Sequence, residues 1–289
     1  MFARASVKTP KHQQGLAFLV LVIIIVLAFT AYMFSDLSVS QINVDRDKNT
    51  QLNLKKAKQA VINYAVTYAD RAIDNDYGIL PNPETFFNGN DGNMAGAAGA
   101  KNTNVVEWLP WRSLDLPNLK DDSGTCLFYA VSGTYKLGAL ADMINEDSIG
   151  MFRVLNSADT VVHGGSADSQ VVALVIAPGA PLQGQSRNPT VVNSGCGRDY
   201  GNVSAYLEGN GVYNNSTTSA AIDTIDDFIH ATETSSTEAT PYNDKFLTIT
   251  REEIWDAIVN RNDFKQDMET LTQALAMCLA EYANLADNS

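Results

Sequence analysis

A few side chains of the kind that carry out catalysis are scattered along this chain. His163 lies in the sequence VVHGGS with Ser166 close by, and His230 ends an apolar run. A serine hydrolase of the common α/β type needs its nucleophile on a sharp turn of the form G-x-S-x-G, and that pattern is absent. The patterns HExxH, P-loop and GxGxxG are absent as well. We therefore expect no enzyme, no catalytic residue and no cofactor.

Acidic loops offer a second kind of chemistry, the binding of a divalent cation. Carboxylate and amide oxygens are the ligands that Ca²⁺ prefers, and two acidic groups and the segment NGNDGN at residues 88–93 supply them. None of these segments has the spacing of an EF-hand loop, so we interpret them as solvated loops and expect no metal site. The acidic residues concerned are Asp121, Asp122, Asp223, Asp226 and Asp227.

The chain has three cysteines, Cys126, Cys196 and Cys278. Cys126 opens an apolar, β-prone run and Cys196 lies in the loop SGCG, so Cys126–Cys196 is the disulfide we favour in an oxidising compartment. Sequence alone does not fix the connectivity. Cys278 falls in an apolar helical stripe, which predicts a buried thiol.

The chain is strongly acidic, with a net charge of -13 and an isoelectric point near 4.5. Such a surface repels phosphate backbones, so we expect no nucleic-acid partner. The local basic group Lys55, Lys56 and Lys58 is interpreted as the solvated face of a helix.

The elements that position these residues begin with an apolar run. Residues 16–34, LAFLVLVIIIVLAFTAYMF, contain no charged residue, and a helix of this length spans the core of a bilayer. Basic residues precede the run and acidic residues follow it, which predicts a cytoplasmic N-terminus and a body outside the inner membrane. The sequence after Phe34 has no A-x-A motif, which argues against a cleaved signal peptide. Spaced along the expected anchor are Leu16, Val20, Ile24, Leu27 and Phe34.

We expect this transmembrane helix to continue beyond the membrane. No Gly or Pro lies between Gly15 and Gly78, and an apolar stripe recurs at steps of three and four. One helix from Leu16 to about Ile73 follows, with residues 35–75 as its continuation and its second half packed on a head. The alternative is an anchor, a flexible stalk and a separate domain that starts near Leu52. The stripe includes Leu54, Val61, Tyr64 and Tyr68.

The remainder predicts a β-rich head. Residues 76–125 form a connecting region rich in Gly, Asn and Pro, residues 126–250 the head, and residues 251–289 C-terminal helices that open on the capping box of Thr250 and Glu253. The fold class is α+β, with a long N-terminal transmembrane helix packed on an antiparallel sheet. The expected strands are 127–131, 151–155, 160–163, 171–177, 203–207, 225–230 and 246–249.

Several of these segments together resemble type IV pilin-like and pseudopilin-like proteins. The basic leader before the apolar run ends at Gly15. After the long helix come ILPNP at residues 79–83, a Gly/Asn-rich excursion, and WLPWRSL at residues 108–114. The segment CLFYAVSGTY, which starts at Cys126, resembles the first head strand of such proteins. The resemblance covers roughly residues 11–135.

The resemblance implies an assembly subunit with a defined life history. A prepilin peptidase would cut between Gly15 and Leu16, the new N-terminus would be methylated, and the apolar helix would pass from the lipid bilayer into a filament with other pilin or pseudopilin subunits. The family usually has Glu at the fifth mature position, where this chain has Val20. Certain minor pilins and minor pseudopilins, including the tip pseudopilin of type II secretion, also lack this Glu. The departure argues against a major subunit, so the expected role is that of a minor subunit in a type IV pilus or a type II secretion filament.

Two alternatives stay open at this point. The apolar run suits equally an unprocessed anchor on an unrelated periplasmic binding or scaffold protein. A short internal repeat aligns residues 58–69 with residues 272–283, which is the pattern expected of a truncated pair of pilin-like modules.

Overall fold

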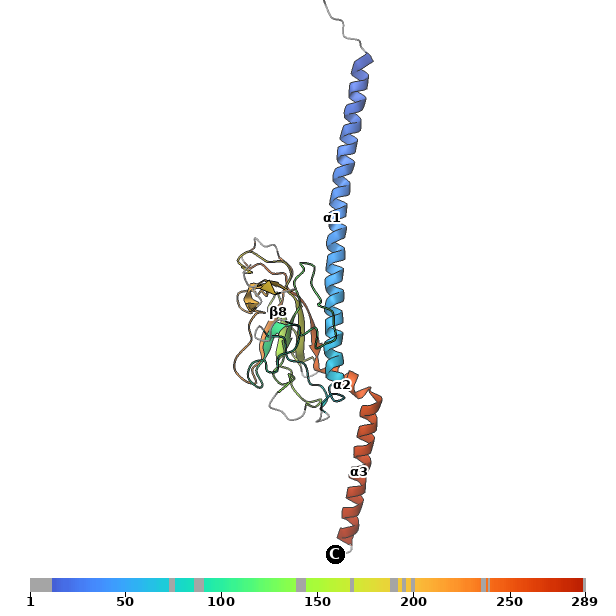
Figure 1. Cartoon of the computed structure of the whole chain (residues 1–289), viewed down its shortest axis with the longest axis vertical. Helices are drawn as coiled ribbons and strands as arrows, with labels where there is room; N and C mark the ends of the chain where they lie inside the picture. The colour runs from blue at the N-terminus through green and yellow to red at the C-terminus, as the bar shows by residue number, and fades with distance from the viewer. Residues whose placement is uncertain are drawn as a thin grey trace, which may run out of the picture. The chain divides into compact units, whose positions relative to one another are not determined.

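The computed structural model describes residues 12–72, 76–85, 91–138, 144–166, 169–187, 192–193, 196–198, 201–234, 238 and 240–287. The chain divides into two units, residues 1–48 and residues 49–289, and we describe each by itself. The second unit is the head, an α+β structure with a mixed, curled sheet and C-terminal helices (Figure 1).

Helix α1 runs from His12 to Val66. It ends earlier than the expected Ile73, which itself lies outside the described residues. The end is fixed by distant parts of the chain, since the N–H of Gly78 donates to the carbonyl of Ala65 at 3.1 Å and the guanidinium of Arg261 donates to the carbonyl of Val66. These groups satisfy carbonyls that another helical turn would have used.

Seven strands of the described head form one sheet with the order β1-β2-β5-β3-β4, to which β8 and β9 pair at the side. Strand β5 pairs antiparallel with β2 and β9, and β3 pairs antiparallel with β4 and with one end of β5. The strands are β1 (Val105–Trp108), β2 (Phe128–Val131), β3 (Phe152–Asn156), β4 (Val161–His163), β5 (Val171–Ala177), β8 (Asp226–His230) and β9 (Lys245–Thr250). A separate ladder joins β6 (Val192–Asn193) and β7 (Gly197–Arg198).

The expectation of an antiparallel sheet is wrong for one pair. Strands β3 and β8 run parallel, with Phe152 opposite Asp226 and Asn156 opposite His230. A parallel pair needs a long crossover, and the chain supplies it between residues 157 and 225. The expected strand at residues 203–207 is also wrong, because Val203–Ala205 is the 3-10 helix η2. Strand β1 was not expected and lies inside the segment interpreted as a connecting region.

The centre of the sheet is buried on both faces, whereas strand β4 is exposed. Strand β5 is fully buried, and its alternate residues serve different cores. Ala173 and Val175 join α1 and helix α2 (Arg251–Val259), while Leu174 and Ile176 join Trp108 on the other face. This placement explains why β5 reads VVALVIA, a continuous apolar run without polar alternation.

Two helices close the chain. Helix α2 begins with the expected capping box, in which Glu253 N donates to Thr250 Oγ1 and Thr250 N donates to Glu253 Oε2. Helix α3 follows at Asn262–Asp287. The expectation that Cys278 is buried is wrong, because the described residues of α3 from Lys265 to Ala283 are exposed and Cys278 is an exposed free thiol. The apolar stripe of α3 has no counterpart to cover it within the described chain.

Candidate assembly helix and its attachment to the head

The N-terminal part of α1 carries exposed apolar side chains. From Leu16 to Tyr32, the large apolar side chains that the structure describes are 42% to 68% exposed, among them Val20, Ile24 and Leu27. Exposed apolar surface of this extent marks a contact with lipid or with another protein. We call residues 16–34 the apolar segment of α1.

A search of the described residues finds no helix with both the length and the apolarity to cross a membrane. The expected anchor also includes Ala17, Ala31, Met33 and Phe34, whose side chains lie outside the described residues. At the expected processing site, Gly15 and Leu16 are both within α1, and Leu16 is 68% exposed.

The C-terminal part of α1 packs on the sheet by the stripe read from the sequence. Leu54 and Val61 are 0% exposed and Tyr64 is 7% exposed, and all three belong to the core cluster that contains Tyr129 and Ile249. Tyr68 lies beyond the end of α1 and is half-buried at the edge of this cluster. The stripe residues therefore attach α1 to the head by burying apolar surface.

Polar contacts hold the register of α1 along the sheet. Lys58 Nζ donates to Glu253 Oε1 at 2.5 Å and to the carbonyl of Thr248 at 2.7 Å. Asn53 Nδ2 donates to the carbonyl of Lys120 at 2.8 Å, and Thr50 Oγ1 accepts from the backbone of Asp122 at 2.9 Å. The interpretation of Lys58 as a solvated lysine is wrong, because this amine joins α1 to β9 and α2.

The end of α1 is covered by a small group of aromatic and cationic side chains. The guanidinium of Arg71 lies 4.2 Å from the centre of the Tyr64 ring and donates to the carbonyl of Tyr64 at 2.8 Å. Arg261 pairs with Asp70 at 2.7 Å as well as with the carbonyl of Val66. Burial is the main cause that raises the pKa of Tyr64, and the nearby Arg71 charge opposes it. Carbonyls at a helix C-terminus attract cations, which explains the two arginines.

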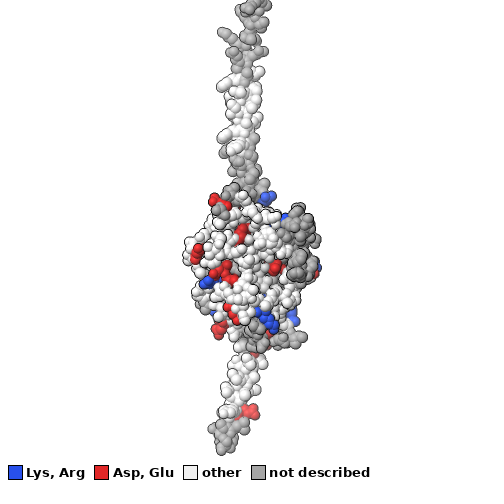
Figure 2. All heavy atoms as spheres, turned by 90° about the vertical axis from the view of Figure 1, so that its left-hand side faces the viewer, with Lys and Arg blue, Asp and Glu red and all other residues white. Residues whose placement is uncertain are grey.

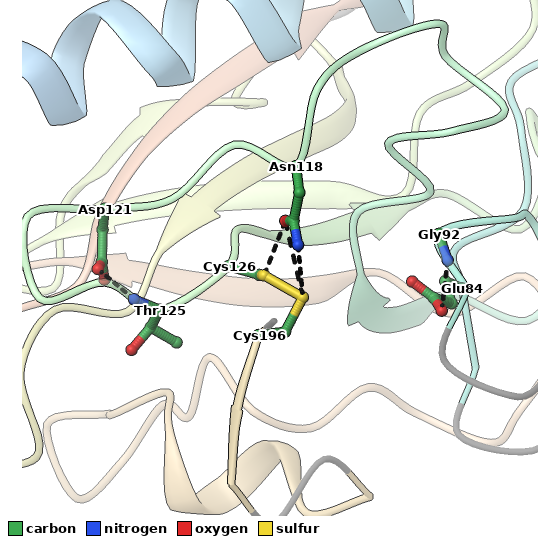
Figure 3. The surroundings of a disulfide bond; sticks show 7 residues. All are labelled: Glu84, Gly92, Asn118, Asp121, Thr125, Cys126 and Cys196. Carbon is green, nitrogen blue, oxygen red and sulfur yellow. Dashed lines mark hydrogen bonds between the residues drawn. A yellow bond between two sulfur atoms is a disulfide. The ribbon is translucent and has the colours of Figure 1, made fainter. Parts of the chain in front are cut away.

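Cys126 and Cys196, the pair favoured from the sequence, are joined in a disulfide. The two residues are 3% and 4% exposed and belong to the core on the side of the sheet away from α1. Figure 3 shows the Asn118 side chain pointing at the bond, with its Nδ2 donating to Cys196 Sγ at 3.4 Å and its Oδ1 2.9 Å from Cys126 Sγ. The disulfide thus ties the loop of Cys196 to the start of β2.

Three of the acidic residues considered for cation binding, Asp121, Asp226 and Asp227, accept hydrogen bonds from the protein. Asp121 Oδ1 accepts from the backbone of Thr125 at 2.9 Å (Figure 3). Its Oδ2 accepts from Gly179 N at 2.8 Å. Asp226 accepts from Asn104 Nδ2 at 2.8 Å. Asp227 accepts two hydrogen bonds from the guanidinium of Arg153 on β3. Among the described residues, no group of three or more His, Cys, Asp or Glu side chains is arranged to hold a metal ion. Residues 88–90 of the NGNDGN segment lie outside the described residues.

His163 and His230 lie at the ends of β4 and β8, and Ser166 lies in the turn after β4. His163 is exposed on β4, whereas Ser166 Oγ shares a hydrogen bond of 2.9 Å with Ser169 Oγ. His230 ends β8 with its ring 4.7 Å from the ring of Phe246. Burial against this neighbour, with a smaller contribution from His163, lowers the pKa of His230.

Sequence reasoning missed two buried polar groups. Lys136 is 2% exposed, and its amine donates to the carbonyls of Ala98 and Ala100 at 2.5 and 2.7 Å. Burial lowers its pKa to about 8. Glu208 and Asp244 exchange backbone-to-carboxylate hydrogen bonds of 3.0 and 3.1 Å, and burial raises the pKa of both. Isolated charges in loops give no periodic pattern, so neither group was recognisable in the sequence.

The charge of the head is spread and not concentrated. Figure 2 shows acidic side chains scattered over one face of the head, with fewer basic ones between them. Comparisons of the chain with protein-family models, with curated proteins and with solved structures find no match. The function therefore has to be argued from α1 and the head.

Proposed function

We propose that this protein is a membrane-anchored minor subunit of the pilin-like or pseudopilin-like type, acting in the assembly of a type IV pilus or a type II secretion filament. The observation that carries the proposal is that two parts of α1 differ in their surroundings. One helix bears an exposed apolar segment at residues 16–34 and, further along, a stripe of buried residues on the sheet of the head.

Physical chemistry supports this assignment of roles. The buried stripe and the polar contacts of Lys58 and Asn53 commit the C-terminal part of α1 to the head, so that part is unavailable for other partners. The exposed apolar segment has no such commitment among the described residues. In the proposal it lies in the inner membrane before assembly, with the N-terminus in the cytoplasm and the head in the periplasm. It then packs against equivalent helices of other subunits, where the same apolar side chains stay out of water.

The first experiment determines the mature N-terminus. Prepilin peptidase processing predicts a chain that starts at Leu16, and mass spectrometry of the protein from its native host measures it. Gly15→Val should block the cut, whereas the neighbouring Gln14→Ala should leave it intact. A start at Met1 in cells with active peptidase, or a start beyond Phe34, would contradict processing.

The second experiment tests assembly through the apolar segment. Ile24→Arg places a charge in mid-run, which costs about 3 kcal/mol for membrane insertion, and should abolish anchoring and crosslinking to other subunits. Val44→Arg is the matched control, since Val44 is an exposed residue of α1 outside the run.

A reporter enzyme fused after Ser289 tests the orientation in the membrane. A reporter that is active only in the periplasm should be active there, and a reporter that is active only in the cytoplasm should be inactive.

A second candidate function is that of an anchored periplasmic binding or scaffold protein outside any filament. A hollow of about 670 Å³ on the head favours it, lined in part by Thr85, Thr103, Thr218 and Glu107. Burial raises the pKa of Glu107 to about 7. Crosslinking in the host separates the two candidates. Capture of pilins or pseudopilins supports the subunit, whereas an unrelated periplasmic partner, with pili and secretion intact after deletion, supports the binding protein.

A further inference from the structure

We propose that α3 pairs with α3 of a second copy of this chain in a parallel, two-stranded coiled coil. This pairing does not depend on the proposed filament role. Helix α3 carries a row of apolar residues along one face. We call Met268, Leu271, Leu275, Cys278 and Tyr282 the α3 seam.

The spacing of the seam is that of a coiled coil. Successive seam residues are three, four, three and four positions apart, and Leu285 extends the series by sequence at the C-terminal end. This is an unbroken seven-residue repeat over three heptads, in which Met268, Leu275 and Tyr282 occupy a positions and Leu271 and Cys278 occupy d positions. A seven-residue repeat keeps one stripe facing a partner helix as the two helices supercoil.

The seam is exposed in the single chain. Met268 is 46% exposed, Leu271 and Leu275 are 61% and 59% exposed, Tyr282 is 73% exposed, and Cys278 is exposed. A fully buried side chain of this kind removes on the order of 100 Å² from water, so two seams would remove roughly 1,000 Å² in total. That area reaches the lower bound of a specific interface, and the flanking Leu279, which is 60% exposed, adds to it.

Charge favours a second copy as the occupant. The chain carries a net charge of -13, so two copies repel each other over most of their surfaces. Residues 270–280 of α3 contain no charged residue, so two copies meet there without repulsion. In a parallel pair, Asp267 lies beside Thr272 of the second copy. An antiparallel pair that joins Leu271 to Leu275 would instead bring Asp267 against Glu281, two like charges at neighbouring positions.

Comparison with α1 argues for a helix and not a sheet as the partner. In the internal repeat, Leu275 corresponds to Val61 and Tyr282 to Tyr68 of the segment that packs on the head. The stripe of the α1 segment includes two small residues, Ala57 and Ala65, both 0% exposed against the sheet. The corresponding residues of α3 are Leu271 and Leu279, which are too large for the same close approach to strands. Another pilin-like head is therefore the competing occupant that the experiment has to exclude.

The first turn of α3 is already fixed to the head. The rings of Tyr77 and Phe264 meet edge to face with their centres 5.3 Å apart, and Arg261 holds Asp70 at 2.7 Å. Ordering of this turn reduces the entropy that dimerisation would otherwise cost. The seam then starts at Met268, one turn beyond the contact with Tyr77.

Cys278 provides the experiment, because the disulfide leaves it as the one free thiol of the three cysteines. In a parallel pair, the two Cys278 residues face each other in the same layer. Purified full-length protein in mild detergent, treated with the thiol oxidant diamide, should form a covalent dimer on a non-reducing gel. Leu271→Cys in a Cys278→Ser background, at the other d position, should form it at a similar rate.

The matched control moves the thiol to the outer face of the same helix. Gln273→Cys in a Cys278→Ser background should crosslink roughly tenfold more slowly, since outward residues lie beyond the ~7 Å between Cα atoms that a disulfide can bridge. Equal crosslinking rates for the Leu271→Cys and Gln273→Cys variants would overturn the proposal. Preferential crosslinking of Leu271→Cys to Cys278 when both thiols are present would overturn the parallel orientation.

A second measurement does not rely on cysteine. Leu275→Glu should convert the dimer to a monomer by light scattering, whereas Gln273→Glu, with the same charge change on the outer face, should leave the dimer intact. Both positions are exposed, so neither variant should alter the unfolding temperature of the head. A monomeric wild-type chain would overturn the proposal. A Leu275→Glu variant that remains a dimer would also overturn it, since the apolar segment of α1 would then hold the two copies together.

Discussion

Replacement of Val61 by Asp tests whether α1 is an integral part of the head. Val61 is 0% exposed in the core cluster between α1 and the sheet. Loss of the valine burial costs about 1.5–2 kcal/mol, and the carboxylate that replaces it would be buried among apolar side chains. The total should be about 4 kcal/mol, within the range seen when an unpaired charge is buried. For a unit of this size, that loss lowers the unfolding temperature by roughly 8–16 °C.

The matched control is Asn63→Asp, which places the same charge on the exposed face of the same helix. Near-ultraviolet circular dichroism of the full chain reports on the tryptophans, Trp108, Trp111 and Trp255, which all lie in the head. The carboxyl group introduced at Val61 should have a pKa above its unfolded value, so the loss of stability should shrink as the pH falls toward 4. Unfolding temperatures of the two variants within about 2 °C of each other would refute the packing argument and favour a separate stalk.

Three further outcomes follow from the structure. Partial burial raises the pKa of Glu107 to about 7, so the folded state loses stability as the pH rises from about 4 to 7, and Glu107→Gln should raise the unfolding temperature at pH 8 more than at pH 4. Because burial and mutual repulsion raise the pKa of Asp244 beside Glu208, Asp244→Asn should cost less stability at pH 8 than at pH 5 in denaturant titrations. Replacement of Cys126 and Cys196 by Ala opens a loop that spans 70 positions and should lower the free energy of unfolding by roughly 4 kcal/mol relative to the oxidised wild type, whereas the reduced wild type should match the double variant in denaturant titrations.

The sequence predicted the elements whose signal is local and periodic. The apolar stripe with Leu54 and Val61 gave the buried face of α1, because a helix repeats every 3.6 residues wherever it packs. The run VVALVIA predicted β5 within its observed bounds, and Thr250 with Glu253 predicted the start of α2. In each case the residues that define the element are neighbours in the chain.

Tertiary structure decided the features that depend on distant partners. Helix α1 ends at Val66 because Gly78 and Arg261 take its last carbonyls, and nothing in the sequence around Val66 encodes that stop. Strand β8 pairs parallel with β3 although its own pattern suits either direction. The α3 stripe predicted a buried face, yet the described chain leaves it exposed.

One physical reason separates the features that the sequence predicted from those that tertiary structure decided. Periodicity in a sequence tells which side chains share a face, since that depends only on the backbone geometry of a few consecutive residues. Whether the face is covered, and by what, depends on which other segments of the chain reach it. Lys136 is ordinary in the sequence, and it is buried only because the carbonyls of Ala98 and Ala100 converge on its amine. The sequence thus determined the apolar faces of this protein, and only the folded chain decided that the C-terminal part of α1 is covered by the head while the apolar stripe of α3 is left exposed.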